Sequence, residues 1–250
     1  MNPPALLAPE LVVLRDVPLR IDPDEVRVFE GYKRAWGGPP ADLEARLPTM
    51  LTEVAAVSRP RVVYRAVAVG GAGPDALMLA GGARLRIPGI GRHWGPIEAV
   101  AVAVATVGAE PEALVAARER AGDPAGARLA DSAASAAVEC LAEWTNDYLC
   151  QLGVAAGLRV TNRISPGLAG WALAEQARLF GLCPAAEIGV ALAVDGAMVP
   201  AKSISFLVGV GRAARVDHYF VQCRRCWAPA CPARRMGALA SVHREGGLAC

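Results

Sequence analysis

Three cysteines near the C-terminus have the spacing of a metal-binding loop. They are Cys223, Cys226 and Cys231, and Pro232 follows the last of them. Clustered thiols in a cytosolic chain bind metals more often than they form disulfides, because a short loop converges the sulfurs on one point. The Cys-Pro ending is typical of iron–sulfur loops more than of zinc ribbons, so an iron–sulfur cluster is predicted, with zinc or no metal as alternatives. Candidates for the fourth ligand are Cys183, His218 and Cys250.

A turn at positions 163–167 has the residue types that bind a small charged ligand. It begins at Arg163 and continues through Ser165, Pro166 and Gly167. A guanidinium suits bidentate capture of a carboxylate, and Gly167 lets the backbone approach a ligand closely because it has no Cβ. The alternatives are a structural ion pair for Arg163 and an ordinary tight turn for the residues that follow it.

A second stretch with chemically useful side chains contains Met198, Lys202 and Ser203 and leads into a strand. Met198 could lie against a flat apolar cofactor, although filling a core is the commoner use of methionine. Lys202 and the serines Ser203 and Ser205 could line a cleft or meet a partner protein. Solvation of a sheet edge is the alternative for these three residues.

Helices and strands in alternation must position both stretches. Helices are expected over residues 22–36, 42–57, 128–151 and 171–180, with another beginning at residue 110, and strands over residues 61–69, 97–107, 187–194 and 202–210. Asp22 and Pro23 have the types of an N-cap and a first helical position, and Asp195-Gly196 predicts a hairpin. Because both hairpins and helices separate the strands, the pattern favours an α+β fold with a largely antiparallel sheet.

The helix expected over residues 128–151 has two stripes at three- and four-residue steps. The apolar stripe comprises Leu129, Ala133, Ala136, Cys140, Trp144 and Tyr148. The polar stripe comprises Ser132, Ser135, Glu139, Glu143 and Asn146. One interpretation of the polar stripe is a solvated helix face. The other is a surface against which a ligand or the sheet packs closely.

The composition disfavours several classes of partner. The net charge is only +2, so nucleic acid is not expected to bind. The longest uncharged apolar run is residues 99–109, which is too short to cross a bilayer although 54% of the chain is hydrophobic. The first residues lack the basic and apolar regions of a signal peptide, so a cytoplasmic location is expected.

Together the two stretches resemble the activation domain family of cobalamin-dependent methionine synthases. Residues 163–167, Trp171 and residues 175–180 are similar to its R-x-S-P-G-Y … W … E-Q … L-F pattern. Residues 188–192 and 198–205 are similar to I-G-V-x-L … M-x-P-x-K-S-x-S. Weaker likeness extends upstream, so the resemblance covers about residues 20–212. It divides the chain into an activation-like domain, residues 1–212, and a cysteine-rich extension, residues 213–250.

The resemblance implies a single C-shaped α+β domain with a twisted, mostly antiparallel sheet flanked by helices. It also implies binding of S-adenosylmethionine and methylation of a reduced cobalamin that a partner protein carries. The partner would be a corrinoid-binding methionine synthase or another corrinoid methyltransferase, and a donor such as flavodoxin or ferredoxin would supply one electron. The chain would then be an accessory subunit with binding residues and no acid–base pair, because the reduced cobalt is itself the nucleophile.

The family pattern also implies roles for single residues. The Arg163 turn and the strand after Pro200 would border the ligand cleft. Leu168 stands where the family has a tyrosine, so that hydroxyl and ring are lost; Trp171 could compensate or serve only in packing. The pattern's ligand-contacting acid on the long helix aligns with Ser135, with Glu139 one turn later. Asp22 matches an N-terminal acid that holds the ligand's amino group, and a helix N-cap is the alternative.

Two other functions remain open at this stage. A module that binds the corrinoid protein without using S-adenosylmethionine would account for Leu168 and the displaced acid. A reductive activator in which the cysteine cluster delivers the electron would account for Cys223, Cys226 and Cys231.

The cysteine prediction is tested by metal analysis of the anaerobically purified chain. We expect iron and acid-labile sulfide, with loss of both in Cys226→Ser because one thiolate ligand is removed. Cys140→Ser, outside the cluster, should keep the wild-type metal content. Wild-type protein without iron or sulfide would contradict the link between this cluster and electron delivery.

Overall fold

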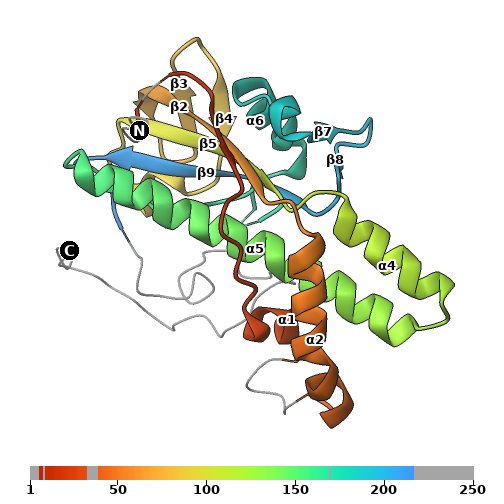
Figure 1. Cartoon of the computed structure of the whole chain (residues 1–250). Helices are drawn as coiled ribbons and strands as arrows, with labels where there is room; N and C mark the ends of the chain where they lie inside the picture. The colour runs from red at the N-terminus through yellow and green to blue at the C-terminus, as the bar shows by residue number, and fades with distance from the viewer. Residues whose placement is uncertain (1–5, 8, 33–38, 169, 217–250) are drawn as a thin grey trace.

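The computed structural model describes residues 6–7, 9–32, 39–168 and 170–216 (Figure 1). The helices are α1 (Pro23–Phe29), α2 (Ala41–Val57), α3 (Ile90–Trp94), α4 (Glu110–Arg120), α5 (Pro124–Ala155) and α6 (Gln176–Leu182), with 3-10 turns η1 (Leu173–Glu175) and η2 (Ala186–Ile188). The strands are β1 (Val12–Arg15), β2 (Arg61–Ala72), β3 (Ala76–Leu79), β4 (Arg84–Arg86), β5 (Ala99–Thr106), β6 (Arg159–Val160), β7 (Ala191–Leu192), β8 (Met198–Val199) and β9 (Ser203–Gly211).

The strands pair antiparallel throughout. The main sheet has seven strands in the order β4-β3-β2-β5-β9-β6, with β1 paired to β2 beside that path. The strand β5 lies at its centre, since β2 and β9 flank it along its whole length. The strands β7 and β8 form a separate two-stranded sheet. Helices and an antiparallel sheet therefore share one architecture, and the predicted α+β class is confirmed.

Alternation along β5 sends its alanines to one face and its valines to the other. The first face, beneath α5, carries Ala99, Ala101, Ala103 and Ala105. The opposite face carries Val100, Val102 and Val104. Every residue of β5 is buried, so both faces of the sheet are covered at its centre. Small side chains on the first face leave room for a helix to approach closely.

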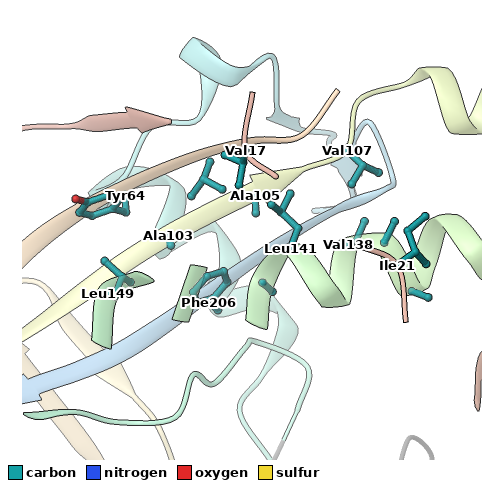
Figure 2. Packing of buried hydrophobic residues seen from close by; sticks show 14 of the residues in the cluster. Val17, Ile21, Tyr64, Ala103, Ala105, Val107, Val138, Leu141, Leu149 and Phe206 are labelled. Atoms are coloured by element: carbon teal, nitrogen blue, oxygen red, sulfur yellow. The ribbon is translucent and has the colours of Figure 1, made fainter. Parts of the chain in front are cut away.

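The helix α5 crosses that face of the sheet (Figures 1 and 2). It is itself rich in small buried residues. Its buried alanines are Ala127, Ala130, Ala133, Ala134, Ala136, Ala137 and Ala142. Larger side chains such as Leu141, Leu149 and Phe206 fill the space around the alanine contact (Figure 2). Close packing of this kind leaves little free volume, so the position of α5 on the sheet is tightly fixed.

The segment after residue 170 covers the opposite face of the sheet. Trp171, Leu179, Cys183 and Ile188 are buried there against the valine face of β5 and Leu207 of β9. This segment also differs from the sequence prediction. Trp171 precedes the helical residues instead of beginning the helix, and the helix is split into η1 and α6. The Trp171 N–H donates to the carbonyl of Leu168, which closes a turn.

Two further elements are shorter than predicted. The strand expected over residues 187–194 is wrong for most of its length, because only Ala191–Leu192 is extended and Gly189 turns the chain with a φ of 76°. The first helix ends at Phe29 instead of continuing to residue 36. The hairpin at Asp195-Gly196 is confirmed, since the Ala193 N–H donates to the carbonyl of Ala197 across the β7–β8 turn.

Among the described residues, even the 32-residue α5 lacks the apolar character that a helix needs to span a membrane.

The alanine contact between α5 and β5 makes a stability prediction. Ala103 is fully buried in it, so Ala103→Leu would overpack the interface and should lower the free energy of unfolding by about 1–3 kcal/mol. Ala116→Leu, on the exposed side of α4, should change it by no more than about 0.5 kcal/mol. Urea unfolding followed by circular dichroism measures both values. Equal stability of Ala103→Leu and wild type would show that α5 is not closely seated.

Candidate functional site

Arg163 is a buried arginine that faces the long helix. Its side chain is 2% exposed, and its Nη2 donates to Glu143 Oε1 at 2.8 Å and to Glu139 Oε1 in a shorter contact. Burial alone would lower the pKa of the guanidinium, but the two carboxylates outweigh this effect and raise the pKa above its usual value. Arg163 is therefore a permanent cation, and it holds two acids of α5 together.

The surrounding segments fix this arginine from several sides. Its backbone N–H donates to Asn146 Oδ1 at 2.8 Å, and its guanidinium lies 5.9 Å from the centre of the Phe206 ring. The next residue, Ile164, forms a bridge with Leu207 of β9. The arginine Nε is buried and has no hydrogen-bond partner among the described residues. Arg163 thus links the turn, the sheet and α5 while one of its donors stays unused.

The two glutamates line a pocket between α5 and the N-terminal segment. Its volume is about 430 Å³, and it is lined by Pro18, Leu19, Arg20, Asp22, Glu25, Glu139, Cys140, Glu143, Trp144 and Asp147. Five of these residues are acids and one, Arg20, is basic. Pockets of a few hundred Å³ hold small molecules, and an excess of carboxylates favours a cation.

Asp22 belongs to this pocket and also caps α1. Its side chain accepts from the Asp24 N–H at 2.9 Å, so the predicted N-cap is confirmed. Its own N–H donates to the Cys140 Sγ at 3.4 Å, which ties the N-terminal segment to α5. Burial is the main cause that raises the pKa of the Cys140 thiol, so this thiol stays protonated in the pocket wall. Capping and pocket lining are compatible roles for Asp22.

One wall of the pocket is aromatic. The ring of Trp144 is stacked on that of Tyr148, with centroids 5.4 Å apart and planes 8° from parallel. Tyr148 in turn meets Tyr64 of β2 edge-on at 6.4 Å. This chain of rings holds the indole of Trp144 in place, so the pocket has an apolar surface beside the acids of α5.

Comparisons with known proteins give one kind of match. No protein-family model matches the sequence, and a search of curated proteins finds no match. Among solved structures, the crystal structure of the MetH reactivation domain bound to AdoHcy matches with a TM-score of 0.59 and 15% sequence identity. The match covers 88% of this chain and 83% of that chain. The chain has the fold of that reactivation domain. At this identity the likeness shows the fold alone.

Within this reactivation-domain fold, the predicted turn lies next to the pocket without lining it. Pro166 is buried, and Ser165 is 5% exposed with an Oγ that has no partner among the described residues. Gly167 has a φ of 87°, a conformation that favours glycine. Leu168 is 42% exposed. The turn therefore presents an apolar side chain at the surface where the family pattern has a tyrosine.

Trp171 lies in the core on the far face of the sheet. It is 2% exposed and packs among the residues that face the valines of β5. Its Nε1–H has no acceptor among the described residues. This placement corresponds to the packing alternative for Trp171, and the residue is absent from the lining of the acidic pocket.

The second predicted stretch meets an earlier part of α5. Lys202 Nζ lies 2.6 Å from Asp131 Oδ1 and donates to Ser135 Oγ at 2.9 Å. The Ser203 Oγ–H donates a hydrogen bond to Thr106 Oγ1 at 2.9 Å, and Met198 packs against the core of the valine face. None of Met198, Lys202 and Ser203 lines the acidic pocket. The two predicted stretches meet on the sheet, where Ile164 bridges Leu207 of β9 and Ser205 Oγ donates to Gln176 Oε1. Of the predicted site residues, however, only Asp22 and Glu139 line the acidic pocket.

The polar stripe of α5 is more than a solvated face. Its members contact other segments one after another: Ser132 with Glu30, Ser135 with Lys202, Glu139 and Glu143 with Arg163, and Asn146 with the Arg163 backbone. Glu143 belongs to the predicted polar stripe but was not among the predicted site residues. Its spacing of four residues from Glu139 was the available signal, since residues so spaced are neighbours on a helix.

The cysteine cluster lies outside the described residues. Cys223, Cys226 and Cys231 are therefore a sequence prediction only. Within the described part of the chain, no group of three or more His, Cys, Asp or Glu side chains could hold a metal ion. The described Cys183, one candidate for the fourth ligand, is buried, and burial raises the pKa of its thiol to about 12.

The buried ion pair makes a second stability prediction. Arg163→Met should lower the free energy of unfolding by about 2–3 kcal/mol, below the range for wholly buried pairs because Glu139 and Glu143 are partly exposed. Arg178→Met removes a surface arginine from Glu175 and should cost less than about 1 kcal/mol. Chemical denaturation of both variants gives the comparison. A cost for Arg163→Met no larger than for Arg178→Met would refute the structural role.

Proposed function

We propose that the acidic pocket binds S-adenosylmethionine and that the chain presents the methyl group of this ligand to a corrinoid on a partner protein. The observation that supports this most directly is the pocket of five acids beside Arg163, in a fold whose solved counterpart was crystallised with AdoHcy. One-electron reduction of the inactive corrinoid would precede methyl transfer, which leaves S-adenosylhomocysteine. The chain would thereby return the corrinoid to service.

The residues of the pocket fit the chemical groups of this ligand. Its sulfonium and amino groups are cations, which suit Asp22, Glu139 and Glu143. Its carboxylate needs a cation, which the exposed Arg20 in the lining would supply. The rigid indole of Trp144 offers a surface for the flat adenine. A volume of about 430 Å³ is within the range of small-ligand pockets.

Positioning is the whole contribution expected of the protein. Reduced cobalt attacks the methyl carbon directly, so no side chain needs to act as nucleophile, acid or base. Holding donor and acceptor in line replaces a bimolecular encounter by a reaction of bound groups. The half-buried Cys140 stays a protonated thiol, so it does not compete for the methyl group. The corrinoid partner would be a methionine synthase or a related methyltransferase, with flavodoxin or ferredoxin as electron donor.

A second candidate function has its own structural support. The Arg163 guanidinium already contacts two carboxylates, and an exposed leucine, Leu168, replaces the tyrosine of the family pattern. A module that grips a corrinoid protein without using S-adenosylmethionine would need neither group. Calorimetry with S-adenosylmethionine separates the candidates, because this module would give no heat.

Binding of S-adenosylmethionine is expected to depend on Asp22. Asp22→Asn keeps a good N-cap for α1 and removes one carboxylate charge, so stability should change little while affinity falls by about tenfold. Asp42→Asn, an exposed acid in the first turn of α2, is the matched control and should bind as wild type does. Titration calorimetry measures all three proteins.

The complete activity is tested under anaerobic conditions. The chain, a cob(II)alamin-loaded partner, a reductant and S-adenosylmethionine should together give the methylcobalamin spectrum. Asp22→Asn should slow its appearance at subsaturating S-adenosylmethionine. Calorimetric binding without any methylcobalamin would exclude the transfer step, and absence of binding would favour the second candidate.

A further inference from the structure

A second pocket lies between the β3–β4 hairpin and the turn that leads into η1. These two segments lie side by side (Figure 1), where Glu175 Oε2 accepts a hydrogen bond from the Arg86 N–H in a long contact of 3.5 Å. The pocket has a volume of about 720 Å³, which is within the range of small-molecule sites. It shares no lining residue with the acidic pocket and is lined by Gly73, Pro74, Asp75, Ala76, Arg84, Arg86, Pro88, Gly170, Ala172 and Glu175.

Two arginines of β4 belong to this lining and lie on the same face of the strand. Successive side chains of a strand point to opposite faces, and Leu85, between Arg84 and Arg86, is fully buried. Leu85 pairs with the buried Leu77 of β3, which fixes the register of the hairpin. Both arginines therefore start from the solvent-facing side, about 6.6 Å apart along the strand.

The charges of these arginines are not matched within the described part of the chain. Neither Arg84 nor Arg86 forms an ion pair or a side-chain hydrogen bond with a described residue. The two acids of the lining are engaged elsewhere. Glu175 accepts from Arg178 Nε at 3.0 Å, and Asp75 accepts from the backbone N–H of residue 89 at 2.6 Å. An anion that enters the pocket therefore meets two guanidinium groups that are available to it.

The opposite wall of the pocket is a turn of small residues. Gly170 and Ala172 line the pocket, while Trp171 between them is 2% exposed and anchors the turn in the core. Gly170 has a φ of 77°, and a Cβ at this position would lie 3.9 Å from Pro88 Cγ on the hairpin side. The absence of a side chain at position 170 thus leaves the space between the two walls open.

Two guanidinium groups on one strand face suit a phosphate better than a single carboxylate. A phosphate monoester carries nearly two negative charges and three terminal oxygens, so it can accept hydrogen bonds from both arginines at once. A carboxylate has one charge and one plane, which a single bidentate arginine satisfies. The rest of the hollow leaves room for the group to which the phosphate is attached.

We propose that this pocket binds a small phosphate monoester of the size of a sugar phosphate. Arg84 and Arg86 hold the phosphate, and the space beside Gly170 and Ala172 takes the body of the ligand. Glu175 steadies the edge of β4 through the Arg86 N–H and keeps its ion pair with Arg178. The site is separate from the acidic pocket, so it does not depend on the proposed use of S-adenosylmethionine.

The test titrates the nitrogen-15-labelled full chain and follows its amide NMR signals. The probes are ribose 5-phosphate, inorganic phosphate, ribose and acetate. We expect ribose 5-phosphate to give saturable shifts centred on Arg84, Arg86 and Gly170, with an affinity about threefold or more above that of inorganic phosphate, because the sugar also contacts the pocket. Acetate should bind about tenfold more weakly than inorganic phosphate, since it carries less charge, and ribose should give no saturable shift.

Variants assign the binding to the two arginines. The double variant Arg84→Gln, Arg86→Gln should bind ribose 5-phosphate about tenfold or more weakly, because both charges near the phosphate are removed. Arg120→Gln, which changes an exposed arginine on α4, is the matched control and should bind as wild type does. Both substituted side chains of the double variant are exposed, so its circular dichroism spectrum should match that of wild type.

Each part of the proposal has an outcome that would overturn it. Ribose 5-phosphate shifts centred on other surfaces, or wild-type affinity in the double variant, would refute the site. Equal affinity for acetate and inorganic phosphate would refute the preference for phosphate. Ribose 5-phosphate that binds no more tightly than inorganic phosphate would refute the placement of the ligand body. These results leave the proposed function untouched, because none of the probes contains a sulfonium or an amino acid group.

Discussion

The close seating of α5 on β5 is the constraint on which the other features of this protein depend. Alanines on both surfaces let the helix lie near the sheet, and dense packing then leaves its rotation little freedom. Once the apolar side of α5 is packed on the sheet, its polar stripe can face only one way. That direction brings Glu139 and Glu143 to Arg163 and Asn146 to the backbone beside it. The pocket is a consequence of how the helix is seated.

Arg163 is a buried charge whose ion-pair partners are partly exposed. Its desolvation is offset by two carboxylates and by a ring contact with Phe206. The two carboxylates remain partly exposed, so the charge of the pair extends to the pocket surface. An apolar residue at position 163 could fill the same space, but it would leave Glu139 and Glu143 to repel each other. The buried cation therefore makes a dense group of acids tolerable.

Local patterns predicted the α+β class, the long helices and the three central strands of the main sheet, but not β1, β3, β4, β6 or α3. The helices α2 and α5, the strands β2, β5 and β9, the Asp22 cap and the Asp195 hairpin follow from periodicity and turn chemistry, which act between near neighbours. The segment 171–194 was predicted less well. Its apolar residues Trp171, Ile188 and Val190 are buried although they lie in turns and short helices. Their hydrophobic pattern therefore resembles that of a longer helix or strand. Their conformation is set by packing against distant parts of the chain, which a short stretch of sequence does not reveal.

The candidate site was harder to predict because it joins parts of the chain that are far apart in sequence. The residue types at positions 163–167 identified Arg163 as a candidate. Its role, however, depends on which residues of α5 it contacts. The family pattern aligns a ligand-contacting acid with Ser135. In this chain Ser135 instead accepts a hydrogen bond from Lys202, which also pairs with Asp131 on the same helix. The acids that face Arg163 lie one and two turns later, at Glu139 and Glu143. Lys202, which follows Pro200, thus contacts one part of the helix, and the acidic pocket is formed toward the C-terminal half, where the N-terminal segment with Asp22 borders it.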